Sequence, residues 1–423
     1  MTRWTYLLTL AGRSAWNRRG TLLFVVFSIT LSTTLLLGLE RIRTQLRESF
    51  VQAVSGTDLV VGARGGNIQL MLYAVFHLGG ATNNMSWDSA REIAGRAEVA
   101  WTIPVSLGDS HRGYPVVGTT GDFFEHYRFR GGTRLALARG TPFAELFDVV
   151  IGSEVAKNLG YNPGQSLVLA HGSSGSLLTE HGDKPFTVTG VLAPTGTPAD
   201  RSLYISLEAM EAIHLDWQGG APLPGLRISP ELAKKFDLEP KNITALLVGL
   251  KKRGQVFALQ REINSWKKEA LTGVMPGVAM DQIWNMVNSG ERALLLISTL
   301  VTITGLAGLA SAILASLGER RRELAVLRSV GARPLDIVIL LACEGILLVG
   351  AGIVCGLAAL AALVASLGPA LADSYGVAVR LSAPSAGEWL ILGGICLAGF
   401  LTSLIPALRA YRMSLADGLC HII

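Results

Sequence analysis

The stretch GERRRELAVLRSVGARP, residues 318–334, decides the fold because it joins two apolar segments. An uncharged stretch, residues 293–317, precedes it, and a second apolar segment begins at Leu335. Arginines beside a membrane-length helix resist translocation, so this stretch is expected on the cytoplasmic side. Gly331 suits the left-handed residue that ends a helix, and Pro334 suits the first turn of the next. The sequence therefore predicts a charged elbow at the inner membrane surface.

Four apolar segments are long enough to cross a membrane. A helix rises about 1.5 Å per residue and needs roughly 20 apolar residues to cross the hydrocarbon layer. Soluble buried helices seldom run this far without a polar face. We therefore predict spans at residues 21–39, 293–317, 335–372 and 389–408.

The charges beside these spans predict the orientation. Residues 1–20 hold four arginines and no acid, and we expect a cytoplasmic amphipathic helix on the membrane. A signal peptide is the alternative, but no small-residue cleavage site follows the apolar run. The chain then crosses outward, returns to the elbow, makes a short outer loop at 373–388 and ends in a cytoplasmic tail, residues 409–423. Arg41, Arg43 and Arg47 oppose this orientation, although long translocated domains obey the charge rule poorly.

Residues 40–292 are left as one large extracytoplasmic domain. Its pattern predicts strands at 57–63, 100–106, 114–119, 185–192, 202–206 and 243–250, and helices at 87–97 and 254–268. The fold class is thus a membrane protein of four spans with an inserted α+β domain. We expect a β-rich subdomain at about 122–218. None of the four cysteines lies in this domain, so it has no disulfides, and the net charge of +5 comes from membrane flanks rather than a nucleic-acid surface.

The elbow carries a family resemblance. Residues 319–332, ERRRELAVLRSVGA, are similar to the charged elbow of MacB-like ABC transporter permeases, which include macrolide exporters, lipoprotein-releasing permeases and FtsX-type proteins. Glu344, and the motifs IPALRA (405–410) and ADGL (416–419), add to the match. The resemblance implies a bacterial inner-membrane permease that forms a homodimer and couples to a separate ABC ATPase. A periplasmic adaptor or substrate-binding protein would be a further partner.

The chain departs from MacB itself by lacking a fused ATPase. A P-loop needs a Gly-Lys pair that brings the lysine to the phosphates, and no lysine here follows a glycine. We therefore expect no catalysis and no cofactor on this chain, with ATP and Mg on the partner. Two alternatives remain: an FtsX-like regulator of an envelope enzyme, and a metal-binding envelope receptor.

The elbow and the third span supply the first candidate site residues. By resemblance the ATPase-coupling residues are Glu319, Arg320, Arg321, Arg322, Glu323, Arg328 and Gly331. The alternative is that the arginines only anchor the topology. Glu344 is either bonded inside its own bundle or part of a proton or substrate path. Gly345, Gly350, Gly352 and Gly356 permit close helix approach.

The outer domain supplies two further candidates. Histidines and carboxylates at His171, Glu180, His181 and Asp183 could bind zinc, but their spacing matches no tight metal motif and a solvated loop is the favoured interpretation. The apolar stretch 67–78 is either a core helix or a surface for a greasy substrate or a partner. The candidate surface residues are Ile68, Met71, Leu72 and Phe76.

Overall fold

The computed structural model describes residues 19–53, 56–79, 83–129, 131–172, 181–218, 221–223, 225–319, 328–329, 331–375 and 381–412. The chain divides into two compact units, one of residues 1–46 and 288–423 and the other of residues 47–287. The first holds the apolar helices, and the second is an α+β domain. Residues 1–18 of the expected surface helix and residues 413–423 of the expected tail lie outside the described residues.

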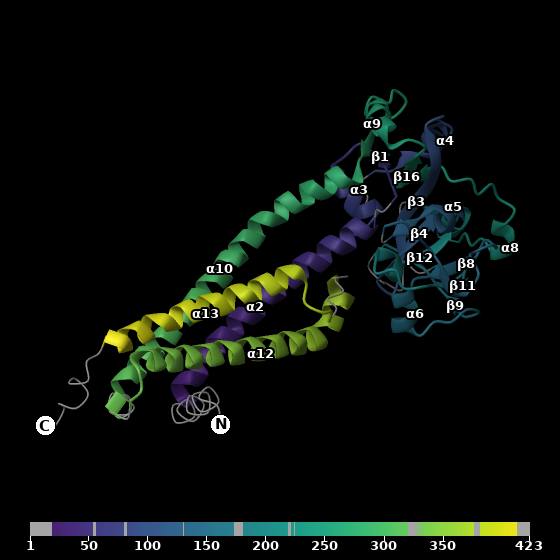
Figure 1. Ribbon diagram of the computed structural model, residues 1–423. Helices are drawn as coiled ribbons and strands as arrows, with labels where there is room; N and C mark the ends of the chain where they lie inside the picture. The colour runs from purple at the N-terminus through teal and green to yellow at the C-terminus, as the bar shows by residue number, and fades with distance from the viewer. Residues whose placement is uncertain are drawn as a thin grey trace. The chain divides into compact units, whose positions relative to one another are not determined.

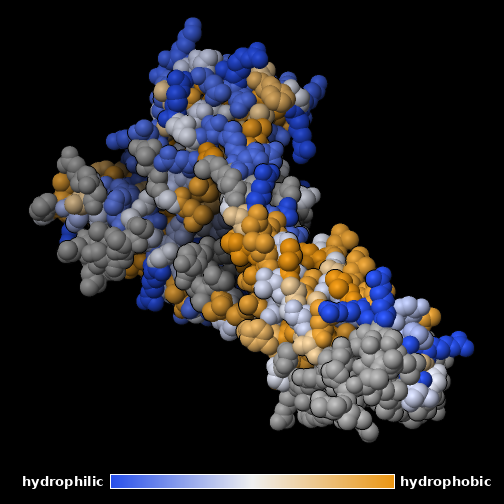
Figure 2. All heavy atoms as spheres, turned by 90° about the vertical axis from the view of Figure 1, so that its left-hand side faces the viewer, coloured by the Kyte–Doolittle hydropathy of each residue, from blue (hydrophilic) through white to orange (hydrophobic). Residues whose placement is uncertain are grey.

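Four helices of the described chain are long and apolar enough to cross a membrane, which confirms the prediction of four spans. Their apolar windows are Leu22–Gln45, Gly290–Ala315, Pro334–Gly368 and Ala386–Arg412. Large apolar side chains such as Phe24, Leu300 and Leu390 are exposed on these helices, and Figure 2 shows apolar surface gathered over them. Such a surface suits lipid. The helices are α2 (Arg19–Ala53), α10 (Pro276–Glu319), α12 (Pro334–Tyr375) and α13 (Ala386–Arg412) (Figure 1).

Glycines let α12 approach its neighbours within this bundle. A Cβ on Gly352 would lie 2.6 Å from Ile29 Cγ2 of α2, and one on Gly345 would lie 2.4 Å from Ser403 Cβ of α13. On the same face, Thr34 Oγ1 donates a hydrogen bond to the Gly356 carbonyl at 3.2 Å. Three of the four predicted glycines therefore serve contacts inside one chain, as small residues do in membrane bundles. Gly350 has nothing within 4 Å among the described residues.

A buried ion pair joins α2 to the start of α13. Arg41 Nε lies 2.9 Å from Glu388 Oε1, and Nη2 lies 3.1 Å from Oε2, with side chains 8% and 4% exposed. Glu388 also accepts the Ser385 N–H, while Ser385 Oγ accepts the Glu388 N–H, which is a capping box at the N-terminus of α13. Arg43 pairs with Glu40 and Glu291. Arg41 and Arg43, which oppose the expected excess of positive charge on the cytoplasmic side, thus pair with carboxylates in the structure.

The α+β domain is built on one mixed sheet of eleven strands. The path runs β17-β1-β16-β3-β4-β12-β8-β11-β7, with β10 on β3 and β9 on β11. Along that path β12 is parallel to β4 and β11 is parallel to β8, whereas the other pairs are antiparallel. The sheet strands are β1 (Leu59–Ala63), β3 (Val99–His111), β4 (Tyr114–Thr119), β7 (Leu137–Gly140), β8 (Asp148–Ile151), β9 (Ser166–Leu167), β10 (Ala170–His171), β11 (Phe186–Leu192), β12 (Leu203–Ser206), β16 (Ala245–Leu250) and β17 (Leu271–Val274).

Three two-stranded ribbons and a set of short helices complete the domain. The ribbons pair β2 (Met85–Ser86) with β15 (Asn242–Ile243), β5 (Arg128–Phe129) with β6 (Thr133–Arg134), and β13 (Trp217–Gln218) with β14 (Ala221–Pro222). The helices are α3 (Asn67–Ala74), α4 (Trp87–Ala94), α5 (Asp122–His126), α6 (Ser153–Leu159), α7 (Leu207–His214), α8 (Pro230–Ala233) and α9 (Val256–Asn264), with 3₁₀ turns η2 (Pro198–Arg201) and η3 (Arg253–Gln255).

The sheet buries both of its faces. Along β1, Val60 belongs to one apolar cluster, whereas Leu59 and Val61 belong to another, as expected from the alternation of side chains along a strand. Residues of α3 and α5 pack in the first cluster, and residues of α4 and α9 pack in the second. A third cluster lies under α6 and α7. The expected β-rich region, residues 122–218, does not form a sheet of its own, because β12 pairs with β4.

Candidate functional site

The elbow lies only partly inside the described residues. Glu319 ends α10, and Gly331 has φ +100°, which is the left-handed conformation expected after a helix. Pro334 opens α12, and the Asp336 carboxylate accepts the Arg333 N–H at 2.8 Å in its first turn. Arg328 lies in a described helical turn. Arg320, Arg321, Arg322 and Glu323 lie outside the described residues, so the coupling role of the whole set stays a prediction.

Glu344 is buried in the helical bundle, on α12. A carboxyl group in such a place is costly unless other groups of the bundle face it. The burial agrees with the interpretation that the residue faces its own bundle. A proton or substrate path through Glu344 stays a prediction.

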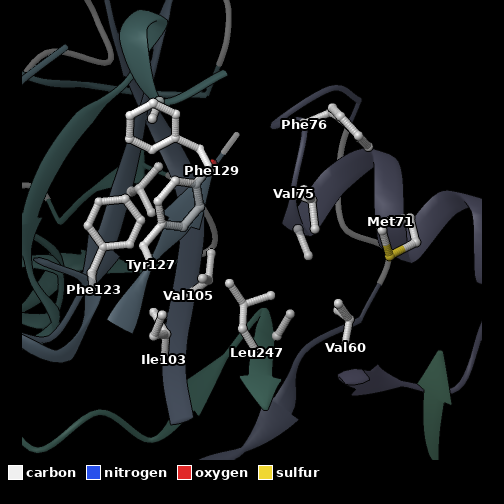
Figure 3. Close-up of a cluster of buried hydrophobic side chains, with 14 of the residues drawn as sticks. Val60, Met71, Val75, Phe76, Ile103, Val105, Phe123, Tyr127, Phe129 and Leu247 are labelled. Atoms are coloured by element: carbon white, nitrogen blue, oxygen red, sulfur yellow. The ribbon is translucent and has the colours of Figure 1, made fainter. Parts of the chain in front are cut away.

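The first eight residues of the apolar stretch 67–78 form α3, and most of the stretch belongs to the core. Met71 and Phe76 are buried in the same cluster as Ile103 and Phe123, so the prediction of a substrate surface is wrong for these two residues (Figure 3). The physical reason is that α3 covers one face of the sheet, where its apolar side chains replace water. Ile68 and Leu72 are half-buried.

A polar cluster in the α+β domain is the strongest candidate site in the described residues. One ligand-type atom from each of Asp109, His171, His181 and His214 lies within 4.8 Å of all the others. His171 Nδ1 is 3.0 Å from Asp109 Oδ1 and 3.1 Å from His214 Nε2. His214 Nε2 and His181 Nε2 lie 3.5 and 3.8 Å from the same carboxylate oxygen. Four groups that commonly bind metals therefore converge on one point.

Backbone pairing brings these residues together. His171 of β10 stands opposite Asp109 of β3 in an antiparallel pair, so their side chains lie on the same face of the sheet. His181 follows soon after β10, and its N–H donates to the Leu169 carbonyl at 2.8 Å. His214 is the last residue of α7, and the Trp217 ring packs 4.3 Å from the His181 ring. Three segments far apart in the sequence thus meet here.

Hydrogen bonds orient the imidazoles of the cluster. His214 Nδ1 lies 2.8 Å from the Met210 carbonyl, which can only accept, so this nitrogen carries a proton and Nε2 presents its lone pair to the cluster when the ring is neutral. Both ring nitrogens of His181 are buried without a hydrogen-bond partner among the described residues, and so is Asp109 Oδ2. Buried polar atoms without partners are costly, and they mark a place where a further group could bind.

The cluster also favours positive charge. Burial alone would raise the pKa of Asp109, but the facing imidazoles of His171, His181 and His214 outweigh this and hold that pKa well below its usual range. Burial would lower the pKa of His214, but the hydrogen bond and charge of Asp109 outweigh it and raise that pKa. Asp109 therefore stays ionised and attracts a cation, whether a proton or a metal ion.

The sequence offered two members of this cluster, His171 and His181, as candidate ligands but favoured a solvated loop, which the full burial of His181 contradicts for that residue. His171 and His181 are members, Asp183 instead pairs with Lys184 at 2.7 Å, and Glu180 lies outside the described residues. Asp109 and His214 were missed because each stands alone in the sequence. Asp109 could have been found if the predicted strand 100–106 had been extended to residue 111, where β3 ends, and paired with the strand that ends at His171.

Comparisons with known proteins decide the family. The model of the MacB-like periplasmic core domain matches residues 20–265, and that of the FtsX-like permease C-terminal domain matches residues 295–415. The chain belongs to the MacB/FtsX-like ABC permease family. The recognition from the elbow is thereby confirmed. Permeases of this family are generally non-catalytic and in general work with ABC ATPase partners.

Two solved structures are similar to about half of this permease. The periplasmic region of MacB from Actinobacillus actinomycetemcomitans is 13% identical with a TM-score of 0.34, and the match covers 56% of this chain and 98% of that one. The extracellular domain of the noncanonic ABC-type transporter YknZ from Gram-positive bacteria is 10% identical with a TM-score of 0.30, covering 52% and 99%. No curated protein sequence matches the chain.

Proposed function

We propose that this permease binds a separate ABC ATPase at the elbow, residues 318–334, and passes its ATP-driven motion to the extracytoplasmic domain. Two copies pair through their spans and bind two ATPase subunits, which hold ATP and Mg. The spans act as levers, and the domain exports or extracts an envelope substrate outside the membrane. The protein lies in a bacterial inner membrane with both termini in the cytoplasm.

The continuity of α10 is the observation that supports this proposal most strongly. One residue, Met275, separates the edge strand β17 from this helix, which runs for 44 residues and ends at Glu319 inside the elbow (Figure 1). At about 1.5 Å per residue its length is roughly 66 Å. No proline interrupts the helix after Pro276, so the chain offers a direct helical connection through which a displacement at the elbow could pass, with the Ser289-Gly290 pair as the place where it would bend.

The arginine distribution supports the orientation. The elbow carries five arginines between two spans, whereas the loop 373–388 carries one. Short flanking loops obey the charge rule best, so the elbow belongs in the cytoplasm, where a soluble ATPase can reach it. An adaptor or substrate-binding protein would meet the domain on the other side.

The proposal is tested by reconstitution. The purified chain alone should hydrolyse no ATP, because no P-loop lysine is present in its sequence, and hydrolysis should appear when its ATPase partner is added. Robust hydrolysis by the clean isolated chain would contradict the proposal. Co-purification of an envelope hydrolase, in place of an adaptor or a substrate-binding protein, would favour the FtsX-like regulator, which uses the same lever without transport.

A further inference from the structure

We propose that Asp109, His171, His181 and His214 form a binding site for one divalent transition-metal ion, with Zn²⁺ as the fitting ion. This inference does not rest on the proposed permease function, because it concerns groups within the α+β domain alone. The ligand set would be three imidazole nitrogens and one carboxylate oxygen.

The distances fit tetrahedral zinc. Zinc bonds to nitrogen or oxygen are about 2.0–2.1 Å long, so two ligand atoms in a tetrahedral site are about 3.3 Å apart. Four separations within the cluster are 3.0, 3.1, 3.5 and 3.8 Å, which bracket that value. A small shift of side chains would therefore place an ion between atoms that already converge.

The chemistry of the ligands selects the class of ion. Imidazole suits zinc and its neighbours in the transition series, whereas Mg²⁺ and Ca²⁺ prefer sites made only of oxygen ligands. The Met210 carbonyl holds His214 in the tautomer whose Nε2 can bind a metal, which is the usual second contact of a zinc-bound histidine. Of the two buried and unpartnered nitrogens of His181, Nε2 faces the cluster and would gain in the metal ion a partner that the described residues do not provide.

The burial and the charge of these side chains also fit a site for a divalent ion. The side chains of Asp109 and His181 are fully buried, whereas those of His171 and His214 are 33% and 28% exposed, which leaves a route for an ion from solvent. Beside the cluster in sequence, Lys184 is buried between Asp183 and Asp216, at 2.7 and 2.8 Å. That triad keeps Asp183 paired and out of the ligand set, and Asp109 supplies the negative charge at the point where the three imidazoles converge, which favours a cation there.

Metal binding to the full-length protein provides the test. The protein is purified in detergent through a tag without histidine, stripped with a chelator, and dialysed against Zn²⁺ before metal analysis. One Zn²⁺ per chain is expected, and the substitutions Asp109→Asn and His214→Gln should each weaken binding about 100-fold or more, because even outer-shell changes cost 10–100-fold. Zn²⁺ should also raise the unfolding temperature of the wild type and not that of the two variants, while Mg²⁺ and Ca²⁺ leave it unchanged.

A second group in the same domain provides the matched control. Asp122, Glu125 and His126 also bring ligand atoms within 4.8 Å, but both acids are exposed. His126→Gln should therefore keep the stoichiometry and the affinity of the wild type. The proposal is overturned if the wild type binds less than one Zn²⁺ at 100 μM, if Asp109→Asn and His214→Gln both bind normally, or if His126→Gln abolishes binding. The two ligand variants change different elements, so one remains informative if the other fails to fold.

Discussion

Removal of Arg41 should destabilise the bundle strongly. The Arg41→Met substitution would leave Glu388 buried without its bidentate partner and free the Ser382 carbonyl, which accepts from Arg41 Nη2 at 3.1 Å. Because both side chains of the pair are less than a tenth exposed, water cannot replace the lost partner. Breaking a buried pair from one side costs about 3–5 kcal/mol. We expect a loss in that range in the free energy of unfolding.

The assay is reversible unfolding in mixed detergent and SDS micelles, and the control is Arg43→Met. Arg43 also pairs with carboxylates, but its side chain is 42% exposed, so its removal should cost about 0–1 kcal/mol. Glu388→Leu and the double substitution Arg41→Met/Glu388→Leu complete a double-mutant cycle, and the double variant should be less destabilised than the sum of the singles. A cost for Arg41→Met as small as that for Arg43→Met, or strict additivity in the cycle, would show that the Arg41–Glu388 pair does not stabilise the bundle.

Three further outcomes are expected. Burial lowers the pKa of His77 to about 4, so the folded state disfavours the proton that the unfolded chain accepts near pH 6.5. The free energy of unfolding should therefore fall by about 2 kcal/mol between pH 6.5 and pH 4 in unfolding titrations, and His77→Asn should remove most of this fall. Gly352→Ala should cost about 1–3 kcal/mol in the same micelle assay because α2 lies against it, whereas Gly350→Ala should be neutral or stabilising, and equal effects would contradict the packing. In a cysteine-free background, an impermeant thiol reagent should label a cysteine at Gly160 from outside the cell and leave one at Arg412 unlabelled; the reverse pattern would invert the topology.

Local patterns in the sequence predicted most of the fold. The spans follow from long apolar runs, and local pattern predicted strands such as β4 and β11, because each of these signals needs only neighbours in the chain. The elbow predicted the family from a few residues. The placement of α3 was open because its composition suits both a core helix and an exposed apolar surface, and only the sheet that it covers decides between them.

Long-range pairing set the limit of prediction. Asp109 and His214 join His171 and His181 only because β10 pairs with β3 and because α7 ends beside them. The same limit applies to Arg41 and Glu388, whose partnership across most of the chain leaves no mark in local sequence. The charge rule identified Arg41 as an exception, and the structure supplies the carboxylate that holds it.

The most direct test of the proposed coupling is charge reversal in the elbow. Arg321→Glu/Arg322→Glu should abolish ATPase binding or stimulation while leaving insertion and the folded α+β domain intact. Arg321→Lys/Arg322→Lys keeps the positive charge that anchors the topology but loses bidentate pairing with carboxylates, so insertion should be normal and stimulation reduced. ATPase stimulation by the reconstituted complex is the measurement. Stimulation should be lost in the glutamate variant and reduced in the lysine variant, and full stimulation by a correctly inserted glutamate variant would contradict ATPase docking at the elbow.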